Sequence, residues 1–331
     1  GVVPTDAGVA QALGTVLSGD LVAQYQPGDD ALRLPRLTLD GQGYRLQASG
    51  QIDGLASGLE MSGKADAVIE DLSRLSVLSK RPLRGAATIT LAGSGSPLGG
   101  SFDLTGSVDG RNLGMGQPEV DRLLADGARI AISGQRNQTG IVLRQLNVDA
   151  SALSTTASGT LASTGSNIRA NLAFSDISTL GPGFGGALAV DAVLTGTPQN
   201  GRITISGEGQ GLRVGKTQAD NLLRGTSTVA AALAIRDETL LVELAELTNQ
   251  QVTARATGRL DGSRRNFALE ARLANLAVIL PEFPGPVTLA FTPYGSELDT
   301  MVAQAREKGH EVLLQVPMEP YDYPDNDPGP Q

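Results

Sequence analysis

The sequence predicts a mainly β protein whose elongated, repetitive antiparallel β-sheet curls into an open trough, in the manner of a β-taco. Three observations lead to this fold class. Apolar and polar residues alternate along most of the 331 residues, similar phrases recur about every 100 residues, and only 3% of residues are aromatic. A closed sandwich fills the space between two sheets with large interdigitating side chains. The scarcity of aromatic residues favours the trough, although the sequence alone leaves both architectures open.

The strands are predicted from about Ala31 to Leu280 by alternation with period two. Such alternation places apolar side chains on one face of a sheet and polar side chains on the other. Gly, Asn and Asp between the runs supply the turns. The clearest runs are "ATITLAG" (87–93), "SFDLTGSVDG" (101–110), "RIAISG" (129–134), "ALAVDAVLTG" (187–196), "RITISGEG" (202–209) and "FALEARL" (267–273).

A repeat of about 100 residues organises these strands. An Ala-Ser/Thr-Gly core recurs with its glycines at Gly50, Gly159 and Gly258, which are 109 and 99 residues apart. Leu123 and Leu222 lie in a second pair of similar phrases, again 99 residues apart. Repeats of this kind stack into a quasi-one-dimensional body.

Short amphipathic helices are expected within each unit, at residues 69–80, 118–127 and 218–225. Their leucines are expected to pack onto the edge of the sheet. Helices in that position would cover edge strands, which otherwise expose unpaired backbone groups.

Composition excludes several classes of function. A net charge of −9 disfavours nucleic-acid partners, and the absence of cysteine excludes disulfides and thiolate metal sites. No apolar run approaches the roughly 18 residues of a membrane span. Since the chain starts without Met, we expect any export signal or anchor to lie outside the sequence given.

No catalytic constellation, metal site or cofactor is predicted. The one histidine is His310, and no serine lies in a G-x-S-x-G elbow. The segment "GSGSPLGG" (93–100) lacks the Lys-Ser/Thr ending of a phosphate-binding loop and is interpreted as a turn.

Two long phrases carry a resemblance to a known family. "LRGAATITLAGSGSPLGGSFDLTGSVDGRNLGMGQPEVDRLLADG" and "GPGFGGALAVDAVLTGTPQNGRITISGEGQGLRVGKTQADNLLRG" resemble the TamB family, the translocation and assembly module subunits related to AsmA-like proteins, over about residues 1–290. The resemblance implies a trough that crosses the periplasm, anchored in the inner membrane through a segment absent here. It also implies support of outer-membrane assembly by moving phospholipids. The implied partner is a TamA-like outer-membrane barrel, bound through a region not present.

A lipid-conducting trough needs a continuous apolar lane without charges. An alternative is that the same inward residues pack against a facing wall of the sheet, and the sequence does not decide between the two. The lane residues predicted to contact acyl chains are Ile89, Leu91, Leu188, Val190, Ile203, Ile205, Phe267 and Leu269.

A different pattern follows the stretch "PGPVTLAFTPYG" (284–295). Val287–Phe291 is predicted to be a strand, Ser296–Gly309 a helix with Ser296 as N-cap, and His310–Met318 a buried strand. Such a β-α-β unit suits a parallel sheet. The chain is therefore divided into a repetitive β domain at residues 1–286 and a short fragment at residues 287–331. The stretch 284–295 is interpreted as the place where two unrelated sequences are joined.

The fragment "TLAFTPYG…AREKGHEVLLQVPMEPYDYPDNDPGP" resembles the divergent polysaccharide deacetylase family. The resemblance implies a NodB-like β/α barrel and metal-assisted hydrolysis of an N-acyl group on a glycan. The family's early Asp-Asp strand is missing, and His310 with Glu311 is not enough for a metal site. The remaining acidic residues of the segment are interpreted as a solvated loop: Glu319, Asp322, Asp325 and Asp327.

Three classes of function remain after these arguments. The first is a non-catalytic, lipid-conducting segment of a TamB-like protein. The second is a truncated deacetylase-family protein without activity, and the third is an extracellular β-repeat surface protein. Calcium-binding nonapeptide repeats would favour the third, and the sequence contains none.

Overall fold

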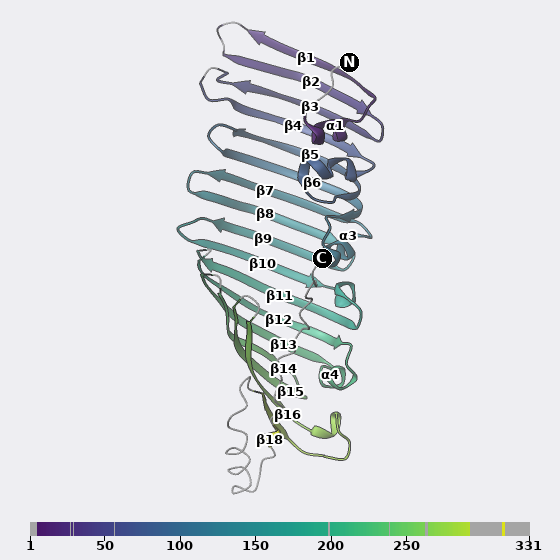
Figure 1. Ribbon diagram of the computed structural model, residues 1–331, viewed down its shortest axis with the longest axis vertical. Helices are drawn as coiled ribbons and strands as arrows, with labels where there is room; N and C mark the ends of the chain where they lie inside the picture. The colour runs from purple at the N-terminus through teal and green to yellow at the C-terminus, as the bar shows by residue number, and fades with distance from the viewer. Residues whose placement is uncertain are drawn as a thin grey trace, which may run out of the picture.

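One long, open β-sheet dominates the molecule (Figure 1). The computed structural model describes residues 5–26, 28, 30–55, 57–197, 199–237, 239–261, 264–291 and 313–314. In this part of the chain the sheet has 18 strands. Each strand from β2 to β17 pairs antiparallel with the strand before it, and β18 pairs parallel with β17. The mainly β, antiparallel fold class is confirmed.

The strands follow one another along the molecule in chain order, from the purple end to the yellow end of Figure 1. They are β1 (Leu17–Gln26), β2 (Ala31–Gly41), β3 (Tyr44–Asp53), β4 (Glu60–Ile69), β5 (Arg84–Ser96), β6 (Ser101–Gly114), β7 (Ala128–Asn137), β8 (Gly140–Ala150), β9 (Leu153–Leu161), β10 (Ser166–Phe174), β11 (Phe184–Gly196), β12 (Asn200–Val214), β13 (Thr226–Arg236), β14 (Thr239–Thr248), β15 (Val252–Asp261), β16 (Arg264–Leu273), β17 (Val287–Phe291) and β18 (Leu313–Leu314).

The short helices lie along one long side of the sheet, at the strand ends, while tight hairpins form the other side (Figure 1). The expected helices exist, but the expectation that they cover edge strands is wrong, because α3 and α4 lie between strands in the middle of the sheet. The helical segments are α1 (Ala7–Leu13), η1 (Leu72–Leu75), α2 (Ser76–Ser79), α3 (Pro118–Leu124), η2 (Ile177–Leu180), α4 (Thr217–Leu222) and η3 (Leu276–Val278).

The helices close this side of the sheet with two small hydrophobic clusters. In the first, Leu72 and Leu124 pack with Ile69, Ala87 and Ala128 from the strand ends. In the second, Ile177 packs with Leu212 and Leu223. Most buried apolar residues of the described chain therefore lie beside the helices rather than in the middle of the sheet.

Irregularities in the strands confirm the repeat predicted from the sequence. Each of β2, β8 and β14 carries a bulge in its middle, between Leu34 and Leu37, Leu143 and Leu146, and Val242 and Ala245. These bulges are 109 and 99 residues apart, the spacing found for the three Ala-Ser/Thr-Gly cores. A repeat unit consequently contains six strands.

The polar caps of the short helices repeat with the strands. Asp71, Asp176 and Asn275 begin η1, η2 and η3, and each side chain accepts a hydrogen bond from the backbone N–H two residues later, at 2.9, 2.9 and 3.1 Å. An N-cap of this type satisfies a helix N–H that has no partner within the helix. The same local solution therefore recurs in three successive units.

The strand predicted at Val287–Phe291 is confirmed as β17, and it occupies the position that β5 and β11 hold in earlier units. Gly285 precedes it with a φ of +125°, as Gly85 and Gly186 lie near the starts of β5 and β11 with φ of +98° and +94°. The repetitive sheet thus continues through residue 291, past the expected boundary at residue 286. The predicted helix at 296–309, together with His310, Glu311 and the acidic loop, lies outside the described residues.

Two expectations about strand limits are corrected. The sheet begins with β1 at Leu17, before the expected start at Ala31. The segment 93–100 is a turn only from Pro97 to Gly100, since Gly93–Ser96 form the end of β5. Glycine and serine in this strand resemble turn composition, which explains the error.

The backbone at the start of β5 needs glycine for two reasons. Gly85 has a φ of +98°, and a Cβ there would lie 2.4 Å from the carbonyl oxygen of Asn112. Gly100, in the β5–β6 turn, also has a positive φ of +64°, but a Cβ there would meet nothing within 4 Å. Substitutions at Gly85 and Gly100 therefore distinguish two effects: both introduce backbone strain, but only the one at Gly85 adds a steric conflict with β6.

We expect Gly85→Ala to lower the free energy of unfolding by about 1 kcal/mol more than Gly100→Ala, which costs only about 1 kcal/mol of left-handed backbone strain. Urea denaturation followed by far-ultraviolet circular dichroism measures both. Equal denaturation midpoints for the two variants would show that the backbone of β6 does not restrict a side chain at residue 85.

A buried carboxylate fastens α3 to β6. Asp121 is 7% exposed, accepts backbone hydrogen bonds from Met115 (2.7 Å) and Gly116 (3.3 Å), and pairs with Arg84 at 3.1 Å. The hydrogen bond from the Met115 N–H is the main cause that lowers the pKa of Asp121 below its ordinary value. Asp220 makes the equivalent bond to the Val214 N–H, at 2.7 Å, one unit later.

Because the folded pKa of Asp121 lies below its unfolded value of about 3.9, this carboxylate stabilises the fold above that pH. The contribution is lost as the pH falls through the folded pKa. We expect Asp121→Asn to be less stable than the unsubstituted chain at pH 7, with the difference shrinking below about pH 4. Denaturation midpoints at several pH values measure this, with Asp66→Asn on the exposed surface as the control; a difference that does not vary with pH would contradict it.

Candidate functional site: an apolar face and its groove

The strand registers bring all eight predicted lane residues to one face of the sheet. Residues that are directly opposite on paired strands share a face, as do alternate residues along a strand. Followed strand by strand, the registers connect Ile89 with Leu188, Ile203 and Phe267 on the same side. We call this side the inner face. Its occupation by lipid stays a prediction.

One cross-strand row shows how the inner face is built. The row passes through every strand from β2 to β16 without a polar or charged residue. Its members are Leu34, Gly50, Gly63, Gly93, Leu104, Gly134, Leu143, Gly159, Ile168, Leu194, Ile203, Leu233, Val242, Gly258 and Phe267.

The other rows of the inner face are mostly apolar, with Thr155, Ser166 and Ser227 among their polar members. In the described sheet, no Asp or Glu occupies a register position of this face. Where side chains are described, Arg136 at the end of β7, on the hairpin side, is the charged residue at a regular position of this face. The middle of the face therefore offers an uncharged path along the sheet.

The opposite, outer face carries the charged and polar side chains, many of them in ion pairs. Arg129 contacts Asp109 at 3.1 Å, and Arg144 contacts Asp103 at 2.5 Å. The bulge in β8 contributes to this separation, because it places Leu143 and Leu146 on the inner face and lets Arg144 reach outward. The alternation predicted from the sequence thus sorts apolar and polar residues onto different faces.

No second sheet covers the inner face in the described part of the chain. The extensive contacts between strands all join neighbours in the sequence. Large apolar side chains of the face consequently stay accessible: Leu91 is 42% exposed, Ile132 48% and Phe267 37%. These contacts do not provide the facing wall against which the lane residues would otherwise pack.

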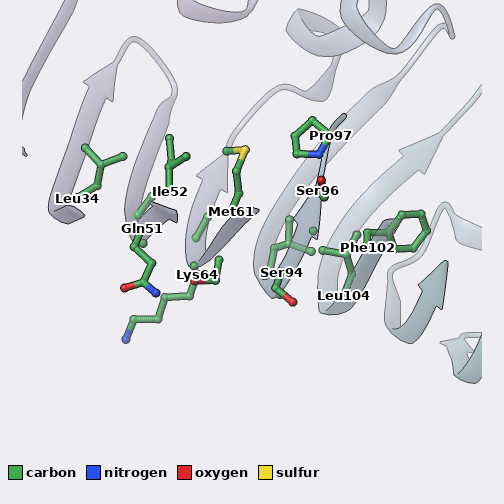
Figure 2. A pocket seen from close by; sticks show the side chains of 18 of the residues that line it. Leu34, Gln51, Ile52, Met61, Lys64, Ser94, Ser96, Pro97, Phe102 and Leu104 are labelled. Atoms are coloured by element: carbon green, nitrogen blue, oxygen red, sulfur yellow. The ribbon is translucent and has the colours of Figure 1, made fainter. Parts of the chain in front are cut away.

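A groove with a volume of about 590 Å³ opens on the inner face over β2 to β7 (Figure 2). Gly50, Gly63 and Gly93 lie directly opposite one another on β3, β4 and β5. Because glycine has no side chain, the floor of the groove is deep at this point. Larger side chains line its sides. Those include Leu34, Ile52, Met61, Phe102 and Leu104.

The close-up also shows the division between the two faces. Ile52 and Met61 point to one side of the sheet, whereas Gln51 and Lys64 point to the other (Figure 2). Sequence reasoning predicted Leu91 in this region but missed the groove itself. The signal, three glycines in register on neighbouring strands, appears only once the pairing of the strands is known.

Other kinds of site are not found in the described residues. No group of three or more His, Asp or Glu side chains could hold a metal ion there. Among the helices of the described chain, none has the length and apolar character needed to cross a membrane.

Comparison with known proteins supports the C-terminal resemblance. Residues 274–331 match the family described as divergent polysaccharide deacetylase. No curated protein and no solved structure matches the chain. The match begins before residue 287, the expected start of the C-terminal fragment, and it includes η3 and also β17, which pairs with β16 in the repetitive sheet.

The groove is expected to bind small apolar ligands, and a charge placed on the inner face tests this. Leu91→Lys puts a charge on the inner face, whereas Thr90→Lys puts it on the outer face opposite Asp66. We expect Leu91→Lys to weaken binding of an apolar fluorescent dye about tenfold, since it replaces apolar contact area with a hydrated ammonium group. Fluorescence titration measures the affinity, and equal affinities for both variants would place the dye elsewhere.

Proposed function

We propose that this chain is a non-catalytic segment of a TamB-like protein that conducts phospholipid acyl chains along its inner face. The observation that carries the proposal is the uncharged row that continues from β2 to β16. Hydrocarbon chains are driven out of water onto apolar surface without directional contacts. A row without charges lets a chain move along the sheet without desolvating an ion.

The architecture supports transport along the molecule rather than storage in one cavity. Each six-strand unit adds the same apolar rows to the next unit, so the path lengthens with every repeat. The outer face keeps its ion pairs in water and the inner face keeps its apolar rows accessible. Together these features suit a trough that carries acyl chains while its back remains hydrated.

Location and partner follow from the same proposal. A segment of this kind would lie in the periplasm, as part of a protein anchored in the inner membrane. Its contact with a TamA-like outer-membrane barrel would require a region outside this chain. Support of outer-membrane assembly is the resulting cellular role.

A deacetylase is the second candidate, favoured by the match of residues 274–331 to that family. The match covers a short part of the chain, and most of its residues lie outside the described ones. We propose that the segment does not catalyse, because the sequence lacks the early Asp-Asp strand and offers His310 alone for a metal. Metal-dependent release of acetate from an acetylated glycan would contradict this.

Site-specific photo-crosslinking tests the lipid proposal directly. A photo-reactive amino acid at Ile203 on the inner face should form phospholipid adducts in cells that export the chain to the periplasm. Thr204 is the matched control, because it is the next residue of β12 and lies on the outer face. Mass spectrometry of the purified chain identifies the adducts.

The expected result is adducts at Ile203 and not at Thr204. Adducts absent from Ile203, Ile205 and Leu233 alike would refute lipid conduction by this segment. Equal labelling at Ile203 and Thr204 would indicate random contact with membranes and would also refute it.

A further inference from the structure

Arg136 is an unusual residue of the inner face. It sits at the hairpin end of β7, directly opposite Phe102 of β6 and Ile141 of β8, and it borders the groove. Its side chain is exposed and makes no hydrogen bond or ion pair with any described residue. A cation in this position has apolar neighbours in register on both sides.

Nearby carboxylates do not neutralise this arginine. Asp103 follows Phe102 in the chain, but it lies on the outer face, where Arg144 holds both of its oxygens, at 2.8 and 2.5 Å. Arg129, on the same strand as Arg136, is likewise paired with Asp109 on the outer face. The guanidinium of Arg136 is therefore available to an anion that approaches the inner face.

The groove also has a direction. It lies over the middle and hairpin ends of the strands and carries Arg136, whereas the hydrophobic cluster that includes Ile69 and Leu72 lies at the helix ends of the same strands. An amphiphile that lies here can bury hydrocarbon toward the helices and place a polar group at the hairpins. The volume of about 590 Å³ lies within the roughly 300–1,000 Å³ usual for ligand sites.

We infer that the groove over β2–β7 and Arg136 together bind a phospholipid, with an acyl chain on the glycine floor and the phosphate at the guanidinium. Guanidinium groups match phosphate with two parallel N–H···O hydrogen bonds and are weakly hydrated compared with ammonium groups. The protein carries a net charge of −9, so an unpaired cation marks the place where an anion is tolerated. This inference rests on the proposed function and adds a headgroup contact to it.

The test compares two lipids that differ only in the phosphate. Acyl-chain-labelled dioleoylphosphatidic acid and dioleoylglycerol are each presented to the purified 331-residue chain from dioleoylphosphatidylcholine vesicles, and transfer to the protein is measured by fluorescence. The variants are Arg136→Gln and Arg169→Gln. Arg169 is the matched control, because it is an exposed arginine on the outer face of β10 and its replacement changes the net charge equally.

The unsubstituted chain and Arg169→Gln should bind phosphatidic acid about tenfold more tightly than dioleoylglycerol, a difference typical of a hydrogen bond between charged groups. Arg136→Gln should lose this preference and bind dioleoylglycerol as before. If Arg136→Gln keeps the preference, the headgroup contact is refuted while the lipid-conducting function stands. If no variant binds either lipid, both are refuted.

Discussion

Strand register is the constraint on which the rest of the structure depends. A shift by one residue between two strands would move every apolar side chain to the polar face. The bulges of β2, β8 and β14 help to keep this register. In each bulge two inner-face residues are three positions apart instead of two, as Leu143 and Leu146 are in β8. Arg144 in that bulge contacts Asp103 on the outer face. The apolar face thus stays continuous across positions where strict alternation fails.

The two sides of the sheet have different roles because only one carries helices. Caps at Asp71, Asp176 and Asn275 fix a short helical segment in each unit, and the leucines beneath it bury the strand ends. The hairpin side has no such cover in the described chain, and Arg136 lies there. The inner face thus has helices along one side and Arg136 on the other, and this difference across its width is the basis of the proposed headgroup contact.

The features that depend on neighbouring residues in the chain could be predicted from the sequence. The features that depend on which residues meet across paired strands could not. Alternation and the recurring glycines Gly50, Gly159 and Gly258 were enough to predict the sheet, its repeat and a single face for the eight lane residues. The groove could not be predicted, because its floor depends on Gly50, Gly63 and Gly93 meeting in register. Gly93 was predicted to lie where a strand run (87–93) meets a turn (93–100), rather than within a strand. Arg136 was missed since its place on the inner face depends on its pairing with Phe102.

The junction near residue 286 shows how one segment can satisfy two patterns. Residues 274–291 belong to the family match, yet they also repeat the earlier units, with Asn275 as a cap, Gly285 in a left-handed conformation and β17 paired with β16. A strand of alternating apolar residues after Pro-Gly-Pro suits an antiparallel meander and a β-α-β unit alike. The parallel pairing of β17 with β18 is the first departure from the meander. The antiparallel meander therefore continues through β17, and the inner face up to that strand is the part of the molecule from which function is to be argued.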